Sequence, residues 1–321
     1  MRLPASRDIQ LASEKRTAID HALGLVCVLS YPLIWVGSLV SLIGLPLALW
    51  FSWHWTAAAL GLLTATAYLP FGNNETVKNF YLRNCPNYFP SCTLRIEEGA
   101  TLGKEGEAPT VLAVSPHGIF CMGWGIAFIH PAFQNLQFCF SSVLLLSPVF
   151  RIFSKLVGKP GSASKGSIKR LLKRGESWAI IPGGFEEATI HSSTAHRVFL
   201  KDRCGFVKYA LQHGYSITPM YCFGENTTFS NMQGLWALRL WLNSLGLPAI
   251  VPWGTWWCGP LMRSVPLLIC VGTPFKLPKI TEPTQEQLAQ HHARYLQHFI
   301  DFFERNNPNK DQKLELWLAL R

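Results

Sequence analysis

The stretch TVLAVSPHG, residues 110–118, is a short apolar run that stops at a turn built from proline and glycine. A run of this kind predicts a buried strand that delivers a side chain at its end. The delivered side chain is His117, held between a proline that fixes φ and a glycine that removes crowding. Its ordinary pKa lies near neutrality, which makes it a candidate general base. A hydrogen-bonded structural histidine at a strand end is the alternative.

A second turn of the same kind lies in IPGGFEEA, residues 181–188. A strand predicted over 177–181 ends there and presents the carboxylates of Glu186 and Glu187. Two strands that end in tight turns, one offering a histidine and one a glutamate, are what an active site at the edge of a sheet requires. Capping of a helix N-terminus is the alternative role for the glutamates.

The rest of the chain after residue 72 alternates strand-like and helix-like segments. Further strands are predicted at 215–223 and 266–272, and a helix over 162–174. Thr284 and Gln287 form a capping-box pattern, which predicts the start of a last helix. The alternation predicts an α/β domain over 72–321, with a mixed sheet flanked by helices.

The N-terminal block has no Asp, Glu, Lys or Arg from His21 to Asn74. One transmembrane helix needs about 20 residues, so we predict a two-span hairpin within 21–71, following a cytosolic segment 1–20. The break is expected at Gly44–Pro46, between spans 21–43 and 47–70. A single re-entrant or interfacial insertion is the alternative. Lys and Arg on both flanks place both ends in the cytosol.

The composition supports membrane contact and limits the remaining classes. The 321 residues are 49% hydrophobic and 15% charged, with a net charge of +10. The basic surplus suits anionic lipid, a polyphosphate ligand or nucleic acid, but no zinc-finger or basic-zipper spacing supports nucleic acid. The nine cysteines show no CxxC pattern, and no His/Cys/Asp cluster has metal-ligand spacing, so we expect neither a disulfide framework nor a bound metal.

Four motifs follow one another in the order and at the spacing of a known family. They are SPHG at 115–118, PGGFEEA at 182–188, RCGFVKYA at 203–210 and FGEN at 223–226. The chain thereby resembles the type-2 diacylglycerol acyltransferase family, which also contains monoacylglycerol and wax-alcohol acyltransferases. The likeness runs from the hairpin to the C-terminal helix. It departs at one position, because Ser115 stands where the family has the first histidine of His-Pro-His-Gly.

The resemblance implies an O-acyltransferase that takes acyl-CoA as its donor, needs no cofactor, and has a fold like the glycerol-phosphate acyltransferases. His117 would be the base. Those related enzymes place an Asp where this chain has Met122, so Glu187 is our candidate for orienting the histidine. The other motif residues implied at the substrates are Ser115, Pro116, Gly118, Gly183, Gly184, Arg203, Gly205, Phe206, Glu225 and Asn226.

The acceptor implied first is diacylglycerol, which would give triacylglycerol. A monoacylglycerol or a long-chain wax alcohol is the runner-up, since no motif separates the three. A non-catalytic lipid-binding membrane homologue is the alternative of another class, and only Ser115 favours it. The protein is expected in the endoplasmic reticulum membrane, with its catalytic domain in the cytosol. The lipid-droplet surface is a second candidate location, and a homo-oligomer is one candidate for the oligomeric state.

Overall fold

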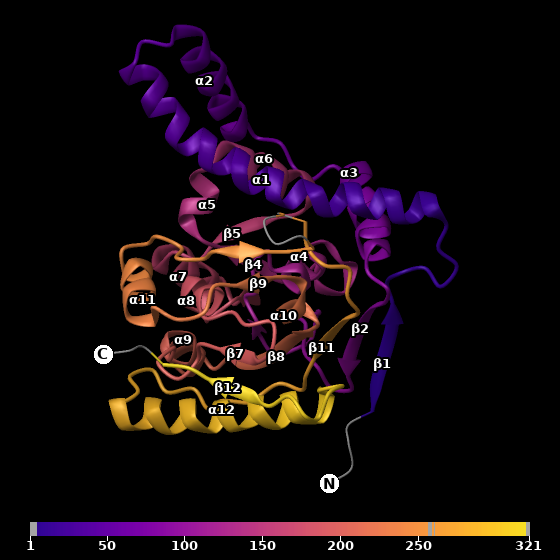
Figure 1. Ribbon diagram of the computed structural model, residues 1–321. Coiled ribbons are helices and arrows are strands. Elements are labelled where there is room, and N and C mark those ends of the chain that lie inside the picture. Colours follow the sequence, from indigo (N-terminus) through magenta and orange to yellow (C-terminus); the bar gives the residue numbers. More distant parts are fainter. Residues whose placement is uncertain (1–4, 256–258, 260, 319–321) are drawn as a thin grey trace.

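The computed structural model describes residues 5–255, 259 and 261–318. Its centre is an eight-stranded sheet in the order β1-β2-β11-β8-β3-β6-β4-β5. The five strands from β8 to β5 run parallel, whereas β11 pairs antiparallel with β8 and β1 antiparallel with β2. In Figure 1 the sheet lies between α12 below and α1 above. The predicted mixed sheet flanked by helices is confirmed.

The strands of this sheet are β1 (Ser6–Gln10), β2 (Cys92–Glu97), β3 (Thr110–Ser115), β4 (Gln137–Phe140), β5 (Pro160–Ser162), β6 (Trp178–Ile180), β8 (Ser216–Phe223) and β11 (Leu267–Val271). Four short strands lie outside it: β7 (His196–Val198), β9 (Ser230–Asn231), β10 (Pro252–Trp253) and β12 (Leu314–Leu316). The helices are α1 (Ala18–Trp50), α2 (His54–Tyr68), α3 (Glu75–Asn84), η1 (Cys85–Tyr88), α4 (Met122–Ile129), η2 (Pro131–Phe133), α5 (Ser142–Leu146), α6 (Pro148–Val157), α7 (Lys165–Arg174), α8 (Gly184–Thr189), α9 (Gly205–His213), α10 (Glu225–Thr228), α11 (Trp236–Ser244) and α12 (Gln285–Asn306).

Strand β3 shows how the sheet separates two cores. Val111 and Ala113 belong to the core that includes residues of α9 and α12. Leu112 and Val114 belong to the other core, which includes residues of α1 and α4. The alternation follows from the period of two in a strand, and burial on both faces accounts for the unbroken apolar run. The end of β3 is therefore fixed from both sides.

The N-terminal hairpin differs from its prediction in where it turns and in the length of its arms. Helix α1 continues through Pro46, and the turn comes at Phe51–Trp53, where Ser52 has a φ of 58°. Amides of Phe51 and Trp53 donate to carbonyls of α1 and so close its end. An apolar helix tolerates an internal proline when neighbouring groups satisfy the freed backbone, so the expected break at Gly44–Pro46 is wrong.

The two helices of the hairpin are unequal. At 1.5 Å per residue, α1 is roughly 50 Å long and α2 roughly 22 Å, against a hydrocarbon core of about 30 Å. Among the described residues, α1 is the one helix long and apolar enough to cross a membrane. Its first half packs on the domain through Cys27 and Val28, while Leu33 and Leu39 farther along are exposed. Figure 1 shows the closed end of the hairpin leaving the domain.

The segment before the hairpin is part of the sheet. Strand β1 pairs with β2 in register from Ser6 opposite Glu97 to Gln10 opposite Thr93. Residues 1–20, expected as a separate N-terminal segment, therefore contribute an edge strand, and α1 starts within them at Ala18. The hairpin is an insertion between two neighbouring strands.

Candidate active site

Three parallel strands end close together and deliver the residues of the site. His117 follows β3, Glu187 lies in α8 after β6, and Glu225 begins α10 after β8. Strands β6 and β8 are the two neighbours of β3 in the sheet. The carboxyl ends of adjacent parallel strands share one edge, where ligands bind in α/β sheets. The topology thus brings three motifs that are far apart in sequence to one place.

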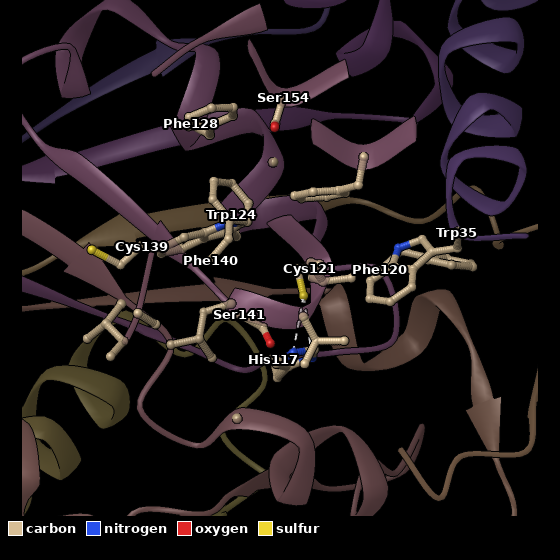
Figure 2. A pocket seen from close by; sticks show the side chains of 18 of the residues that line it. Trp35, His117, Phe120, Cys121, Trp124, Phe128, Cys139, Phe140, Ser141 and Ser154 are labelled. Atoms are coloured by element: carbon tan, nitrogen blue, oxygen red, sulfur yellow. Dashed lines mark hydrogen bonds between the residues drawn. The ribbon is translucent and has the colours of Figure 1, made fainter. Parts of the chain in front are cut away.

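The ring of His117 is held by its own turn. Its Nδ1 lies 2.9 Å from the carbonyl oxygen of Gly118. A carbonyl can only accept, so Nδ1 carries the proton and Nε2 keeps its lone pair. The sulfur of Cys121 lies 3.4 Å from Nδ1, and Figure 2 shows it facing the ring. Burial lowers the pKa of His117 below its ordinary value, while the Gly118 carbonyl and Glu186 oppose that shift.

Glu187 contacts the backbone of His117 rather than its ring. Its Oε1 accepts from the amide of His117 at 2.6 Å, and its Oε2 accepts from the amide of Phe199 at 2.9 Å. The side chain is 1% exposed, and this burial raises its pKa to about 7 against the opposing effect of the two amides and Arg203. The candidate for orienting the imidazole thus fixes the turn that carries the imidazole, through the amide of His117.

Gly183 leaves the space that Glu187 occupies. A Cβ at position 183 would lie 1.9 Å from Oε2 of Glu187, which is closer than any two such atoms approach. The next residue, Gly184, has a φ of 59°, in the left-handed region that favours glycine. The Pro-Gly-Gly sequence therefore supplies both the room for the buried carboxylate and the shape of the turn.

Glu225 supports the same turn from the other side. Its Oε2 accepts from the amide of Gly123 at 2.8 Å, at the start of α4. Its Oε1 is buried and has no hydrogen-bond partner among the described residues. This oxygen would lie 2.6 Å from a Cβ on Gly118, whose φ of 63° also favours glycine. Burial raises the pKa of Glu225 to about 7.

Arg203 and Glu186 form an ion pair beside the histidine. The guanidinium also lies over the ring of Phe199, 5.2 Å from its centroid. Its Nε atom is buried, and no described residue accepts a hydrogen bond from it. Both charged side chains line the cavity described next, and Glu186 helps to keep the pKa of His117 from falling further.

An apolar cavity of about 520 Å³ extends from His117 toward α1 and α6. Its volume is in the range of small-molecule sites. Figure 2 shows Trp124, Phe128 and Phe140 on its wall. Helix α1 closes it with Tyr31, Ile34 and Trp35. Glu186 and Arg203 are the only charged side chains among the described lining residues. The cavity is therefore polar beside the histidine and apolar elsewhere.

The remaining predicted residues divide between the cavity and its support. Gly184 lines the cavity, whereas Ser115, Pro116, Gly118 and Gly183 lie behind it. Ser115 is 1% exposed at the end of β3, and among the described residues no hydrogen bond joins its side chain to His117.

The motifs that follow α8 and β8 mostly lie away from the cavity. Gly205 begins α9, and Phe206 packs edge-on against Tyr295 in the core beneath the sheet. Asn226 is buried at 4% exposure, and its Nδ2 has no hydrogen-bond partner within the described ranges. Of the residues expected at the substrates, Gly205, Phe206, Glu225 and Asn226 do not line the cavity.

Several residues of the site were not singled out from the sequence. Cys121 lies against the imidazole, and none of the four quoted motifs contains it. Tyr31 and Trp35 come from the helix expected to serve the membrane alone. The spacing of four residues between His117 and Cys121, with Gly118 between them, was the one local signal for the cysteine.

Comparisons with known proteins identify the chain. A model of the diacylglycerol acyltransferase family matches residues 47–319. The chain is 29% identical to human 2-acylglycerol O-acyltransferase 3 over 62% of its own length and 64% of that protein. It is 28% identical to human diacylglycerol O-acyltransferase 2-like protein 6 over 85% of its length and 88% of that protein. Human acyl-CoA wax alcohol acyltransferase 2 is 28% identical over 64% of this chain and 69% of that one.

The chain is also similar to a solved structure. This is the crystal structure of the 1-acyl-sn-glycerophosphate acyltransferase PlsC from Thermotoga maritima, with a TM-score of 0.43 and 12% identity, covering 90% of this chain and 100% of that one.

A histidine that lines an apolar cavity, on a sheet joined to a membrane-type helix, has the features of a lipid-modifying enzyme. The match over residues 47–319 is more specific, and the chain belongs to the diacylglycerol acyltransferase family. The prediction of an acyltransferase is thereby confirmed.

Proposed function

We propose that the chain is an acyl-CoA-dependent O-acyltransferase that esterifies a lipid alcohol with His117 as general base. The observation that carries the proposal is His117 itself, which lines an apolar cavity and donates from Nδ1 to Gly118. Nε2, 3.7 Å from the sulfur of Cys121, then keeps its lone pair. Family membership supplies the class of reaction. The relatives support acyl acceptors of the glycerolipid or wax-alcohol type, because their names state them.

The proposed reaction is direct transfer. Nε2 of His117 takes the proton of the alcohol while the alcohol oxygen attacks the thioester carbonyl. The C–S bond then breaks, and the proton returns from Nε2 to the departing CoA thiolate. No acyl-enzyme forms in this scheme. The lowered pKa of His117 keeps the ring neutral, and able to accept a proton, at neutral pH.

The charge that develops on the carbonyl oxygen needs hydrogen-bond donors. The amide of His117 is occupied by Glu187, and Gly118 does not line the cavity. Gly184 does line it, so its amide is our candidate donor. Arg203 lies at the same polar end and is our candidate contact for a phosphate or the acceptor's polar head.

Diacylglycerol is the acceptor that we propose first, with monoacylglycerol or a long-chain alcohol second. For the membrane, we propose that the α1–α2 hairpin enters and leaves on one face, at the endoplasmic reticulum, with the catalytic domain in the cytosol. The short α2 suits a re-entrant insertion as well as a two-span hairpin, and both give this sidedness.

The two sequons differ in what they can report about sidedness. Asn226 is 4% exposed, so the fold itself keeps it from a glycan. Asn74 is exposed and caps α3 by accepting from Thr76 and Val77. Glycosylation of Asn74 would therefore contradict the cytosolic placement, whereas an unmodified Asn226 would say nothing.

The test is an ester-formation assay on membranes that contain the full chain. Labelled acyl-CoA is supplied with diacylglycerol, monoacylglycerol or a fatty alcohol. We expect ester with at least one acceptor, and we expect His117→Ala to abolish it. Undiminished activity in His117→Ala would overturn the mechanism. Absence of ester with all three acceptors would favour the non-catalytic lipid-binding homologue.

A further inference from the structure

Helix α11 presents its apolar side to solvent. Leu235, Leu238, Trp241 and Leu245 are between 52% and 65% exposed, and their spacing places them on one face of the helix. Between Glu225 and Arg263 the sequence has a single charged residue, Arg239. This pattern is the reverse of an ordinary surface helix, which turns its apolar stripe inward.

Arg239 points inward and holds the helix in this orientation. The side chain is 3% exposed. Its guanidinium donates to the carbonyls of Ala249, Thr189, Met232 and Gly234. The inverted orientation is therefore built into the fold, because releasing the helix would leave a buried cation and four carbonyls without partners.

Helix α5 carries the same kind of surface beside the cavity. Val143 and Leu146 are 55% and 58% exposed. Val143 and Leu144 also line the cavity. The whole segment between Glu107 and Arg151 contains no Asp, Glu, Lys or Arg. Because Val143 is both exposed and part of the cavity wall, the cavity meets the apolar outer side of α5 there.

We propose that α5 and α11 form a second membrane-contacting surface, which rests on a phospholipid bilayer and opens the cavity to it. In Figure 1 both helices lie on the left of the molecule, the side toward which the closed end of the hairpin leans. The hairpin tip, with Trp50 at 83% and Trp55 at 91% exposed, and this surface can therefore contact one membrane together.

A bilayer fits this surface better than a second copy of the chain. Aromatic and aliphatic side chains with no exposed charge among them are suited to the boundary between headgroups and acyl chains. The surface also continues the contact that α1 makes, and the cavity whose wall reaches it is apolar along its length. The inference rests on the proposed function for what enters the cavity, but the contact itself can be measured without any reaction.

The test is photo-crosslinking of the full chain reconstituted in phosphatidylcholine vesicles without acyl-CoA or acceptor. The variant is Leu238→p-benzoylphenylalanine on α11. The matched control is Ala293→p-benzoylphenylalanine on α12, which is exposed and lies on the side of the sheet away from α1. We expect phospholipid adducts at position 238 in several-fold higher yield than at position 293.

Equal yields at the two positions would overturn the proposal, as would crosslinks from position 238 mainly into a second copy of the chain. Leu146→p-benzoylphenylalanine extends the test to α5, and phospholipid adducts there are expected as well. Because no turnover is measured, lipid adducts from an inactive chain would refute the proposed function and leave the surface standing.

Discussion

The two sides of the His117 turn are supported by buried glutamates that perform different tasks. On one side, both oxygens of Glu187 accept backbone amides, from His117 and from Phe199. On the other side, one oxygen of Glu225 accepts from Gly123, and the other has no hydrogen-bond partner in the part of the chain that the structure describes. Burial raises the pKa of both carboxyls to about 7. The difference teaches that similar pKa values can belong to unlike roles. In both residues hydrogen bonds oppose the effect of burial, but Glu187 ties the His117 turn to Phe199, whereas Glu225 accepts at the start of α4.

The largest effect in this comparison is expected from Glu187→Gln. A glutamine would place an NH2 group against the amide of His117 or of Phe199, leaving donors facing each other in a buried site. Such a loss is worth about 2–3 kcal/mol, or roughly a hundredfold in kcat. The measurement is kcat and KM for acyl-CoA in reconstituted membranes, with kcat falling more than KM rises.

The matched control is Glu225→Gln, which changes the same group on the other side of the turn. Its oxygen can still accept from Gly123, and its NH2 group takes the place of an acid's O–H. We expect activity within a few-fold of wild type. Equal losses in the two variants would show that the two sides are alike and that our distinction is wrong.

Glu225→Gln should also change how stability depends on pH. The folded pKa of Glu225 is raised from 4.5 to about 7, so the protonated acid's contribution is complete below pH 4.5 and is lost as the pH rises through 7. That loss is roughly 3 kcal/mol per group. The glutamine does not titrate, so the unfolding free energy of the variant minus that of the wild type should rise by about this much from pH 5 to pH 8. Denaturant unfolding at several pH values measures it, and a constant difference would contradict the assignment.

The smallest effect is expected at Ser115, which shares the turn but contacts neither glutamate among the described hydrogen bonds. Ser115 is buried behind the cavity, so Ser115→Ala removes one small hydroxyl at a cost of about 1 kcal/mol. We expect activity to fall less than tenfold. A loss as deep as that of His117→Ala would show that the hydroxyl acts on the base directly.

Much of the site's framework could be predicted from local patterns. Strands β3, β6, β8 and β11 appear where buried apolar runs end at Pro or Gly, and the capping box at Thr284 does open α12. Edge strands such as β1 and β5 could not be predicted, because three to five residues of mixed exposure carry no periodic signal.

The contacts inside the site were less predictable than its strands. The motifs show that Glu187 and His117 belong together, but whether the carboxylate meets the ring or the backbone depends on how β6 and β3 lie in the sheet. In the same way, the contact of Cys121 with the imidazole accompanies a backbone φ of 54° at Cys121, which cannot be read from the sequence. The path of α1 through Pro46 depends on packing against α2 and α6.

The pairing of β1 with β2 affects how the catalytic domain can be prepared. The hairpin is inserted in the sequence between two strands that are hydrogen-bonded to each other. An ion pair between Asp8 and Arg95 also links the two strands. A fragment trimmed from the N-terminus to remove the membrane helices would also lose β1. The edge of β2 would then be unpaired and could pair with the edge of another chain. A trimmed version should instead keep β1 and the first half of α1, which packs on the domain and lines the cavity. Only the closed end of the hairpin would then be replaced by a short internal linker, which preserves the edge strand and shortens the loop that the chain must close.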